Sequence, residues 1–166
     1  MKSKLTPEIA EFIGMHIGDG TLYKTKNSFV WEMRVDLKEK NYYDFFVVPL
    51  LSKLFNYEFK AKFRSGGKNG CYGVQTCNKD LIHTLVSMGI KPGKKNNIQV
   101  PKKFMNSSQK IKSAFLRGYF DTDGCIRFDK PNKSIVAYYP RIEFCTISKN
   151  LCFDVKKLLL DLGLKS

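Results

Sequence analysis

Apolar residues recur at two different spacings along the chain, and each spacing predicts one kind of element. Residues 6–20 place isoleucine and phenylalanine every three or four positions, as in a helix with one buried face. Thr6 suits the N-cap of this helix, Pro7 suits its first turn, and Gly20 suits its end. Residues 29–37 instead alternate apolar and polar side chains, which predicts a strand with one buried side.

The same two spacings continue to the end of the chain. Residues 41–55 are apolar at helical spacing, and Pro49 is expected to kink that helix. Residues 58–64 alternate, with the aromatic side chains of Phe59 and Phe63 expected to point inward. The remaining pattern predicts a strand at 71–77, a helix at 79–88, a linker-like stretch, a helix ending at 123, strands at 125–128 and 138–146, and a helix at 148–162.

The predicted elements form an internal repeat. A glycine and aspartate pattern occurs twice at an offset of 104, as Gly14, Asp19 and Gly20 and then as Gly118, Asp123 and Gly124. Asparagine and leucine positions in the second helix of each half match at an offset of 109, and we assign the five-residue difference to the hairpin loop. The first half reads α-β-β-α-β-β-α, whereas the second stops after α-β-β-α. We therefore predict an α+β fold of two pseudo-two-fold halves with antiparallel sheets, the second apparently truncated.

This repeat sets the expected domain boundaries. Residues 1–90 form the N-terminal half, residues 91–106 a linker, and residues 107–166 an incomplete C-terminal half. The last half lacks equivalents of a hairpin and a helix, so we expect a truncated chain, a degenerate copy, or a partner that supplies the missing part. A monomer with pseudo-two-fold symmetry is expected, with self-association if the C-terminal half is truly incomplete.

Composition narrows the class of partner. The 166 residues carry 29 Lys and Arg against 15 Asp and Glu, a net charge of +14, which favours a polyanion such as nucleic acid. No apolar run is long enough to cross a membrane, and the N-terminus lacks a signal-peptide pattern, so a cytoplasmic protein is expected. The five cysteines form no C-x-x-C pair, which argues against zinc and for reduced thiols.

The two repeated helices break a local electrostatic rule. Both end in an aspartate, Asp19 and Asp123, although the C-terminus of a helix is the negative end of its dipole. A bound divalent cation would remove this conflict, and two neighbouring carboxylates would need one even more. Gly14 and Gly118 leave a notch on each helix, so the helices are expected to touch and to bring the aspartates together.

At these residues the chain resembles a known family. Residues 116–124, Leu-Arg-Gly-Tyr-Phe-Asp-Thr-Asp-Gly, closely resemble the LAGLIDADG motif, and residues 12–20 look like a divergent first copy. Each copy leads into a strand, and the resemblance covers residues 5–166. The chain is similar to single-chain, two-motif LAGLIDADG homing endonucleases, particularly the small archaeal kind.

The resemblance implies a DNA endonuclease that uses a divalent metal, here Mg²⁺. Asp19 and Asp123 match the acidic metal-binding positions of the family, and the carbonyls of Gly18 and Thr122 match its accessory ligands. Lys38 lies where family members place a basic or polar pocket residue, so it joins Asp19 and Asp123 as a catalytic candidate. The implied reaction is hydrolysis of both strands of double-stranded DNA at a long pseudo-palindromic target.

The strands themselves suggest a DNA-binding face. Polar side chains that point outward from an antiparallel sheet can meet base edges and phosphates in the major groove. The outward candidates and the basic turn residue beside them are Arg34, Lys60, Lys62, Arg64, Lys68, Gln75, Arg127 and Arg141.

The sequence is also compatible with alternative roles for some residues and for the whole chain. His16 and Trp31 are expected to be packed core residues rather than a ligand and a base-stacking platform. The main alternative function is a DNA- or RNA-binding relative that does not cleave, such as an intron-splicing maturase or a degenerate copy. The chain opens with Met1-Lys2 and has no terminal His-Asn pair, which favours a free-standing or intron-encoded enzyme over an intein.

Overall fold

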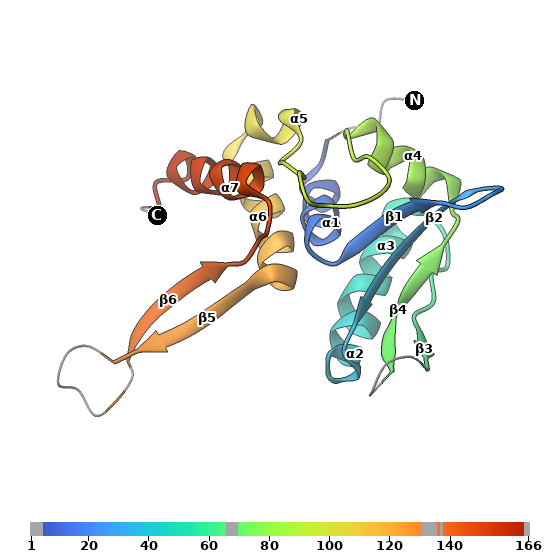
Figure 1. Cartoon of the computed structure of the whole chain (residues 1–166), viewed down its shortest axis with the longest axis horizontal. Helices are drawn as coiled ribbons and strands as arrows, with labels where there is room; N and C mark the ends of the chain where they lie inside the picture. The colour runs from blue at the N-terminus through green and yellow to red at the C-terminus, as the bar shows by residue number, and fades with distance from the viewer. Residues whose placement is uncertain (1–4, 66–69, 131–135, 137, 165–166) are drawn as a thin grey trace.

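The computed structural model describes residues 5–65, 70–130, 136 and 138–164. Two long helices, α1 (Pro7–Gly18) and α6 (Gln109–Asp123), pack against each other at its centre. The sheet of the first half lies on one side of this pair, and the hairpin of the second half projects on the other side (Figure 1). Lys68, one of the DNA-binding candidates, lies outside the described residues.

The first half contains a four-stranded antiparallel sheet in the order β1-β2-β4-β3. Helix α3 (Val48–Phe55) lies behind this sheet, and the short helix α2 (Lys40–Tyr42) lies at its N-terminal end (Figure 1). The elements after α1 are β1 (Gly20–Lys24), β2 (Phe29–Val35), η1 (Leu37–Glu39), α2 (Lys40–Tyr42), η2 (Tyr43–Val47), α3 (Val48–Phe55), β3 (Lys62–Arg64), β4 (Cys71–Thr76) and α4 (Lys79–Ser87).

The second half contains a two-stranded antiparallel sheet, β5-β6. After the connecting helix α5 (Lys102–Met105) and α6, its elements are β5 (Gly124–Asp129), β6 (Tyr139–Phe144) and α7 (Lys149–Asp161). Mixed helices and antiparallel sheets arranged as two α-β-β-α repeats agree with the predicted fold class.

Several local predictions are confirmed. The Thr6 hydroxyl accepts a hydrogen bond from the Ile9 N–H and caps α1, with Pro7 at its first position. Trp31 and His16 are both buried in the core. All five cysteines are free thiols.

The helix over residues 41–55 differs from a simple kinked helix. Residues Tyr43–Val47 form a turn of π-helix, and α3 begins directly after it with Pro49 in its first turn. Proline lacks an N–H and its ring clashes with the preceding turn of an α-helix, so a wider turn before it relieves both conflicts.

Three sequence predictions about the strands and the linker need correction. Only Lys62–Arg64 form the strand predicted over 58–64, and Phe63 is exposed rather than inward, although Phe59 is buried. The stretch expected to be a plain linker, residues 91–106, contains α5 and two buried core residues, Val100 and Phe104. Apolar residues spaced too irregularly for a helix or strand can still fill a core.

The strand registers also correct the repeat. Gly20 pairs with Met33 in the first half, and Gly124 pairs with Phe144 in the second. The offset between the halves therefore grows from 104 at the first strand to 111 at the second. The hairpin loop thus absorbs seven residues rather than five, and the segment before α7 is two residues shorter than its counterpart.

Candidate active site at the crossing of the two motif helices

Glycines let α1 and α6 touch backbone to backbone. A Cβ atom on Gly14 would lie 2.1 Å from the carbonyl oxygen of Phe115, and one on Gly118 would lie 2.0 Å from that of Glu11. Both distances are far shorter than any van der Waals contact, so only glycine fits at either position. The helix crossing predicted from the two glycines is therefore present, and the two backbones are in direct contact at both positions.

An ion pair also joins the two helices beside Gly118. The Nε and one terminal nitrogen of Arg117 each donate a hydrogen bond of 2.6 Å to the carboxylate of Glu11. The Glu11 side chain is 7% exposed and the Arg117 side chain is 56% exposed, so a buried carboxylate is held by a guanidinium at the surface. This bidentate contact neutralises the carboxylate and also fixes the orientation of the two side chains relative to each other.

The crossing brings the C-terminal ends of the two motif helices together. Asp19 is the C-cap of α1, and Asp123 is the last residue of α6. A Cβ atom on Gly18 would lie 1.9 Å from the Thr122 hydroxyl and 3.4 Å from Oδ2 of Asp123. The Asp123 carboxylate therefore lies beside the last turn of α1, next to Asp19.

Burial disfavours the charged form of both aspartates, and the charge of Asp123 adds to this effect at Asp19. Burial, followed by the charge of Asp123, raises the pKa of Asp19 to about 6. Burial also raises the pKa of Asp123. Because each carboxylate also faces the negative end of a helix dipole, the pair creates a strong local demand for a cation.

Lys95 supplies part of that positive charge, and sequence reasoning missed it. Its ammonium donates to the carbonyl oxygens of His16 and Ile17, each at 3.0 Å, and to that of Gly18 at 2.5 Å. Burial lowers the pKa of Lys95 to about 8, while Asp123 and Asp19 act in the opposite direction. In the sequence this residue is one of many lysines in the stretch read as a linker, so nothing distinguished it.

His16 is packed in the core beside the site, as the sequence predicted. Its Nδ1 accepts a hydrogen bond of 3.0 Å from Nε1 of Trp31, and both side chains are buried. Burial, followed by the charge of Lys95, lowers the pKa of His16 to about 3, so the imidazole is neutral at physiological pH. A Cβ atom on Gly20 would lie 2.3 Å from the same Nδ1, so the motif glycine makes room for this ring.

Two tyrosines from the first half also approach the site. The Tyr42 hydroxyl donates to Oδ2 of Asp121 at 3.1 Å and so links the first half to α6. The Tyr43 hydroxyl is buried and has no hydrogen-bond partner among the described residues. Burial, followed by the charge of Asp19, raises the pKa of Tyr43.

The donor atoms of the site suit a hard divalent cation. The two motif carboxylates supply oxygen atoms, as does the Gly18 carbonyl, which also accepts the hydrogen bond from Lys95. The unpartnered Tyr43 hydroxyl is close enough to Asp19 for the carboxylate charge to raise its pKa. Among the described residues, no three or more His, Cys, Asp or Glu side chains gather closely enough to form a complete metal cage. A site with few carboxylates fits Mg²⁺, which keeps several waters and uses substrate phosphates as ligands.

Lys38 occupies a different position from the aspartates. It lies in the exposed turn η1, where its backbone N–H donates to Oδ1 of Asp36 at 2.9 Å. In the described part of the chain its side chain makes no polar contact with either motif aspartate.

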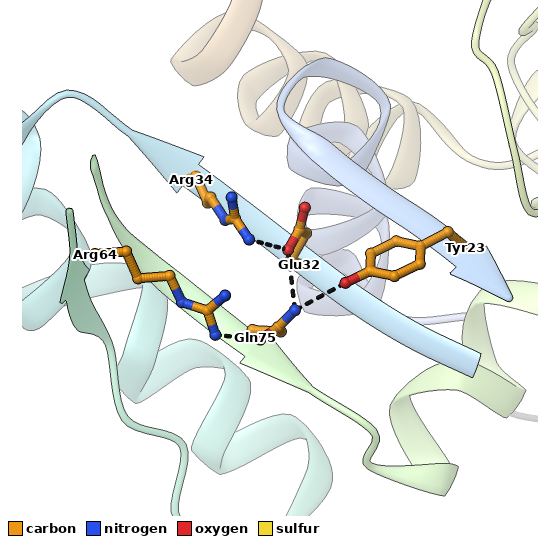
Figure 2. A network of polar contacts seen from close by, with 5 residues as sticks. All are labelled: Tyr23, Glu32, Arg34, Arg64 and Gln75. Atoms are coloured by element: carbon orange, nitrogen blue, oxygen red, sulfur yellow. Dashed lines mark hydrogen bonds and ion pairs between the residues drawn. The ribbon is translucent and has the colours of Figure 1, made fainter. Parts of the chain in front are cut away.

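The outer face of the first sheet carries a connected polar network (Figure 2). Glu32 accepts a hydrogen bond from Arg34 at 2.5 Å and one from Nε2 of Gln75 at 3.2 Å. Nε2 of Gln75 also donates to the Tyr23 hydroxyl at 2.8 Å, and Arg64 donates to Oε1 of Gln75. Three predicted DNA-binding residues, Arg34, Arg64 and Gln75, thus lie together and share contacts with Glu32 and Tyr23.

The other outward candidates are distributed over both halves. Lys62 is an exposed residue of β3, and Lys60 lies before that strand and pairs with Glu58 at 3.0 Å. Arg127 and Arg141 face each other across β5 and β6, and both pair with Asp129.

Sequence comparison matches part of the chain to a family and the whole chain to segments of larger proteins. Residues 110–166 match the sequence profile of the LAGLIDADG-like domain. The chain is 29% identical over 163 residues to the replication factor C small subunit of Methanocaldococcus jannaschii, covering 98% of this chain and 8% of that protein. It is 25% identical to the ribonucleoside-diphosphate reductase NrdEB subunit alpha of Bacillus subtilis, covering 95% of this chain and 14% of that protein. The chain thus spans only a small part of these relatives.

Structural comparison shows the fold. A structure of I-DmoI in complex with DNA and Mn matches with a TM-score of 0.65 at 20% identity, covering 98% of this chain and 81% of I-DmoI. The meganuclease I-SmaMI bound to uncleavable DNA matches with a TM-score of 0.53 at 14% identity, covering 98% of this chain and 72% of that one. The chain therefore has the fold of the LAGLIDADG homing endonucleases, and residues 110–166 also match the LAGLIDADG-like domain in sequence, as the two motifs indicated.

Proposed function

We propose that the chain is a site-specific homing endonuclease that cleaves both strands of duplex DNA in a reaction dependent on Mg²⁺. The observation that carries this proposal is the meeting of Asp19 and Asp123 at the ends of two crossing helices. The neighbours of similar fold include structures solved with DNA and with Mn, Ca or Mg, which supports a divalent metal and a DNA substrate.

Each residue of the site has a role in this proposal. Asp19 and Asp123 would hold the cation, with the carbonyl oxygens of Gly18 and Thr122 as accessory ligands. When bound, Mg²⁺ supplies an activated water and stabilises charge on the leaving oxygen. Lys95 keeps its positive charge beside both carboxylates at neutral pH and so lowers their repulsion. Lys38 remains a candidate that would act only once DNA lies against η1.

The outer faces of the two sheets would bind the duplex. Arg34, Arg64 and Gln75 lie on one sheet, and Arg127 and Arg141 lie on the other. The two sheets lie on opposite sides of the motif helices (Figure 1). This arrangement supports a pseudo-palindromic target read by two similar surfaces. The net charge of +14 supports strong, salt-dependent binding through phosphates.

The sequence relatives support an origin as a mobile segment. A replication factor subunit and a reductase subunit have unrelated names, yet each contains a segment that resembles almost all of this chain. An inserted element of the intein type would explain this distribution, although the sequence alone favoured a free-standing or intron-encoded enzyme.

Target selection followed by cleavage tests the proposed function. Duplexes retained by the protein from a randomised library in Ca²⁺ are cloned into a plasmid and incubated with Mg²⁺ or with EDTA. We expect linear plasmid only with Mg²⁺ and only with the wild type, and no cleavage by an Asp19→Asn/Asp123→Asn double variant. Selected targets that the wild type binds and never cuts would instead favour the non-cleaving, maturase-like alternative.

A further inference from the structure

The strand registers place two glutamates at equivalent positions of the two halves. Glu32 directly precedes Met33, the strand partner of Gly20, and Glu143 directly precedes Phe144, the strand partner of Gly124. Both side chains lie on outer faces, and each is one register position from the glycine that follows a motif aspartate. The two acids are therefore related by the pseudo-two-fold axis and flank the candidate active site.

Each glutamate holds an arginine. Glu32 accepts the hydrogen bond of 2.5 Å from Arg34 (Figure 2), and Oε1 of Glu143 pairs with a terminal nitrogen of Arg127 at 2.9 Å. Arg34 has no other ion-pair partner among the described residues, whereas Arg127 also pairs with Asp129 at 3.1 Å. Each half thus contains a glutamate paired with an arginine, although Arg34 lies on the same strand as Glu32 and Arg127 lies on the strand next to Glu143.

Carboxylates on these faces oppose simple phosphate binding. A chain with a net charge of +14 gains affinity for DNA from every free arginine, and a glutamate both neutralises one arginine and repels phosphates. On DNA, a carboxylate can only accept hydrogen bonds, and cytosine N4 is a donor in the major groove. A guanidinium matches guanine O6 and N7 in the same groove. A neighbouring arginine and glutamate can therefore contact the guanine and the cytosine of one G·C base pair.

We propose that Glu32 and Glu143 are discrimination residues, each of which keeps an arginine away from phosphates and directs it to a G·C base pair. The two G·C pairs lie at symmetric positions on either side of the cleaved centre. This inference rests on the proposed function, because it assigns a target preference to the DNA-binding faces of the same site.

Salt-dependent binding to random DNA tests the first part of the proposal. The probe is a fluorescein-labelled duplex of mixed sequence, titrated with wild type, Glu32→Gln and Glu143→Gln over a range of salt concentrations. We expect Glu32→Gln to bind more tightly and to steepen the slope of log K against log salt by about 0.9, because Arg34 becomes free to contact one phosphate. Glu143→Gln should steepen it less, because Arg127 keeps Asp129.

Two controls separate this effect from a general change of charge. Asp161→Asn removes one negative charge from the ion pair between α6 and α7, where Asp161 contacts Lys112 at 2.6 Å, and should leave the slope unchanged. Arg34→Gln added to Glu32→Gln should restore the wild-type slope. An equal change in Asp161→Asn, or no change in Glu32→Gln, would overturn the proposal.

Sequence selection tests the second part. From a randomised library in Ca²⁺, the wild type should enrich two symmetric G·C pairs, and each glutamine variant should lose the preference at one of them by about 5- to 100-fold. Unchanged preferences in both variants would overturn the assignment. Wild type that selects these duplexes but does not cut them with Mg²⁺ would refute the nuclease function alone, and wild type that binds no duplex would refute both.

Discussion

The two halves place similar apolar residues at equivalent strand positions but bury them very differently. Leu22 and Trp31 are strand partners in the first half and are 2% and 0% exposed, whereas their counterparts Ile126 and Ile142 are 58% and 66% exposed. In the first half α1 and α3 cover this face, while the β5–β6 hairpin projects away from α7 (Figure 1). The alternation of a strand therefore indicates which face is apolar, and the helices around it determine whether that face is buried.

The largest expected loss of stability comes from disrupting the contact between α1 and α6, which both halves share. Gly14→Ala places a Cβ atom 2.1 Å from the Phe115 carbonyl, so the two helices must separate. We expect the free energy of unfolding to fall by about 4 kcal/mol or more, or the protein not to fold. Urea unfolding measures this. Lys110→Ala on the exposed face of α6 is the matched control, and a similar loss there would contradict the assigned contact.

The next effect tests the contrast between the two sheets directly. Leu22→Ala removes a buried side chain and should cost about 3 kcal/mol, whereas Ile126→Ala at the equivalent position should cost less than about 1 kcal/mol. Chemical denaturation of both variants provides the comparison. Equal losses would mean that the hairpin face is covered in solution.

The ion pair between the motif helices should contribute a smaller amount to the free energy of unfolding. Arg117→Met leaves the buried Glu11 carboxylate without its guanidinium, so we expect a loss of about 2–3 kcal/mol. Adding Glu11→Gln should recover part of it, because the unpaired charge is then removed. The contrary result is a double variant that is less stable than Arg117→Met by the amount that Glu11→Gln alone costs the wild type. The two side chains would then contribute independently and not as a pair.

The smallest effect concerns pH. The pKa of Asp19 is about 6 in the folded state against an ordinary value of 3.8, so ionisation costs stability as the pH rises from about 4 to 6, and this cost persists above that range. Asp19→Asn should therefore stabilise the protein in EDTA by about 1 kcal/mol at pH 7, a value reduced by solvent screening, and not at pH 4. Unfolding curves at both pH values measure this difference, and destabilisation at pH 7 would be the contrary result.

The sequence predicted the elements that depend on local spacing and capping. Thr6, Pro7 and the apolar spacing defined α1, and the glycine and aspartate repeat indicated a crossing of two helices. It could not predict contacts between distant segments, since they depend on the folded chain. Lys95 reaches the end of α1 from a stretch without periodicity, and Glu32 gains its importance from Arg34 and Gln75 on the assembled sheet.

Cleavage by the two single variants is the most direct test of the account, whose central claim is one composite site built by both motif aspartates. A supercoiled plasmid that carries a selected target is incubated with Mg²⁺ and wild type, Asp19→Asn or Asp123→Asn, and the nicked and linear products are quantified over time. We expect each variant to form linear product more than about 100-fold more slowly than wild type, since even the partners that orient metal ligands are worth 10- to 100-fold. Linear product formed at the wild-type rate by either variant would contradict the shared site.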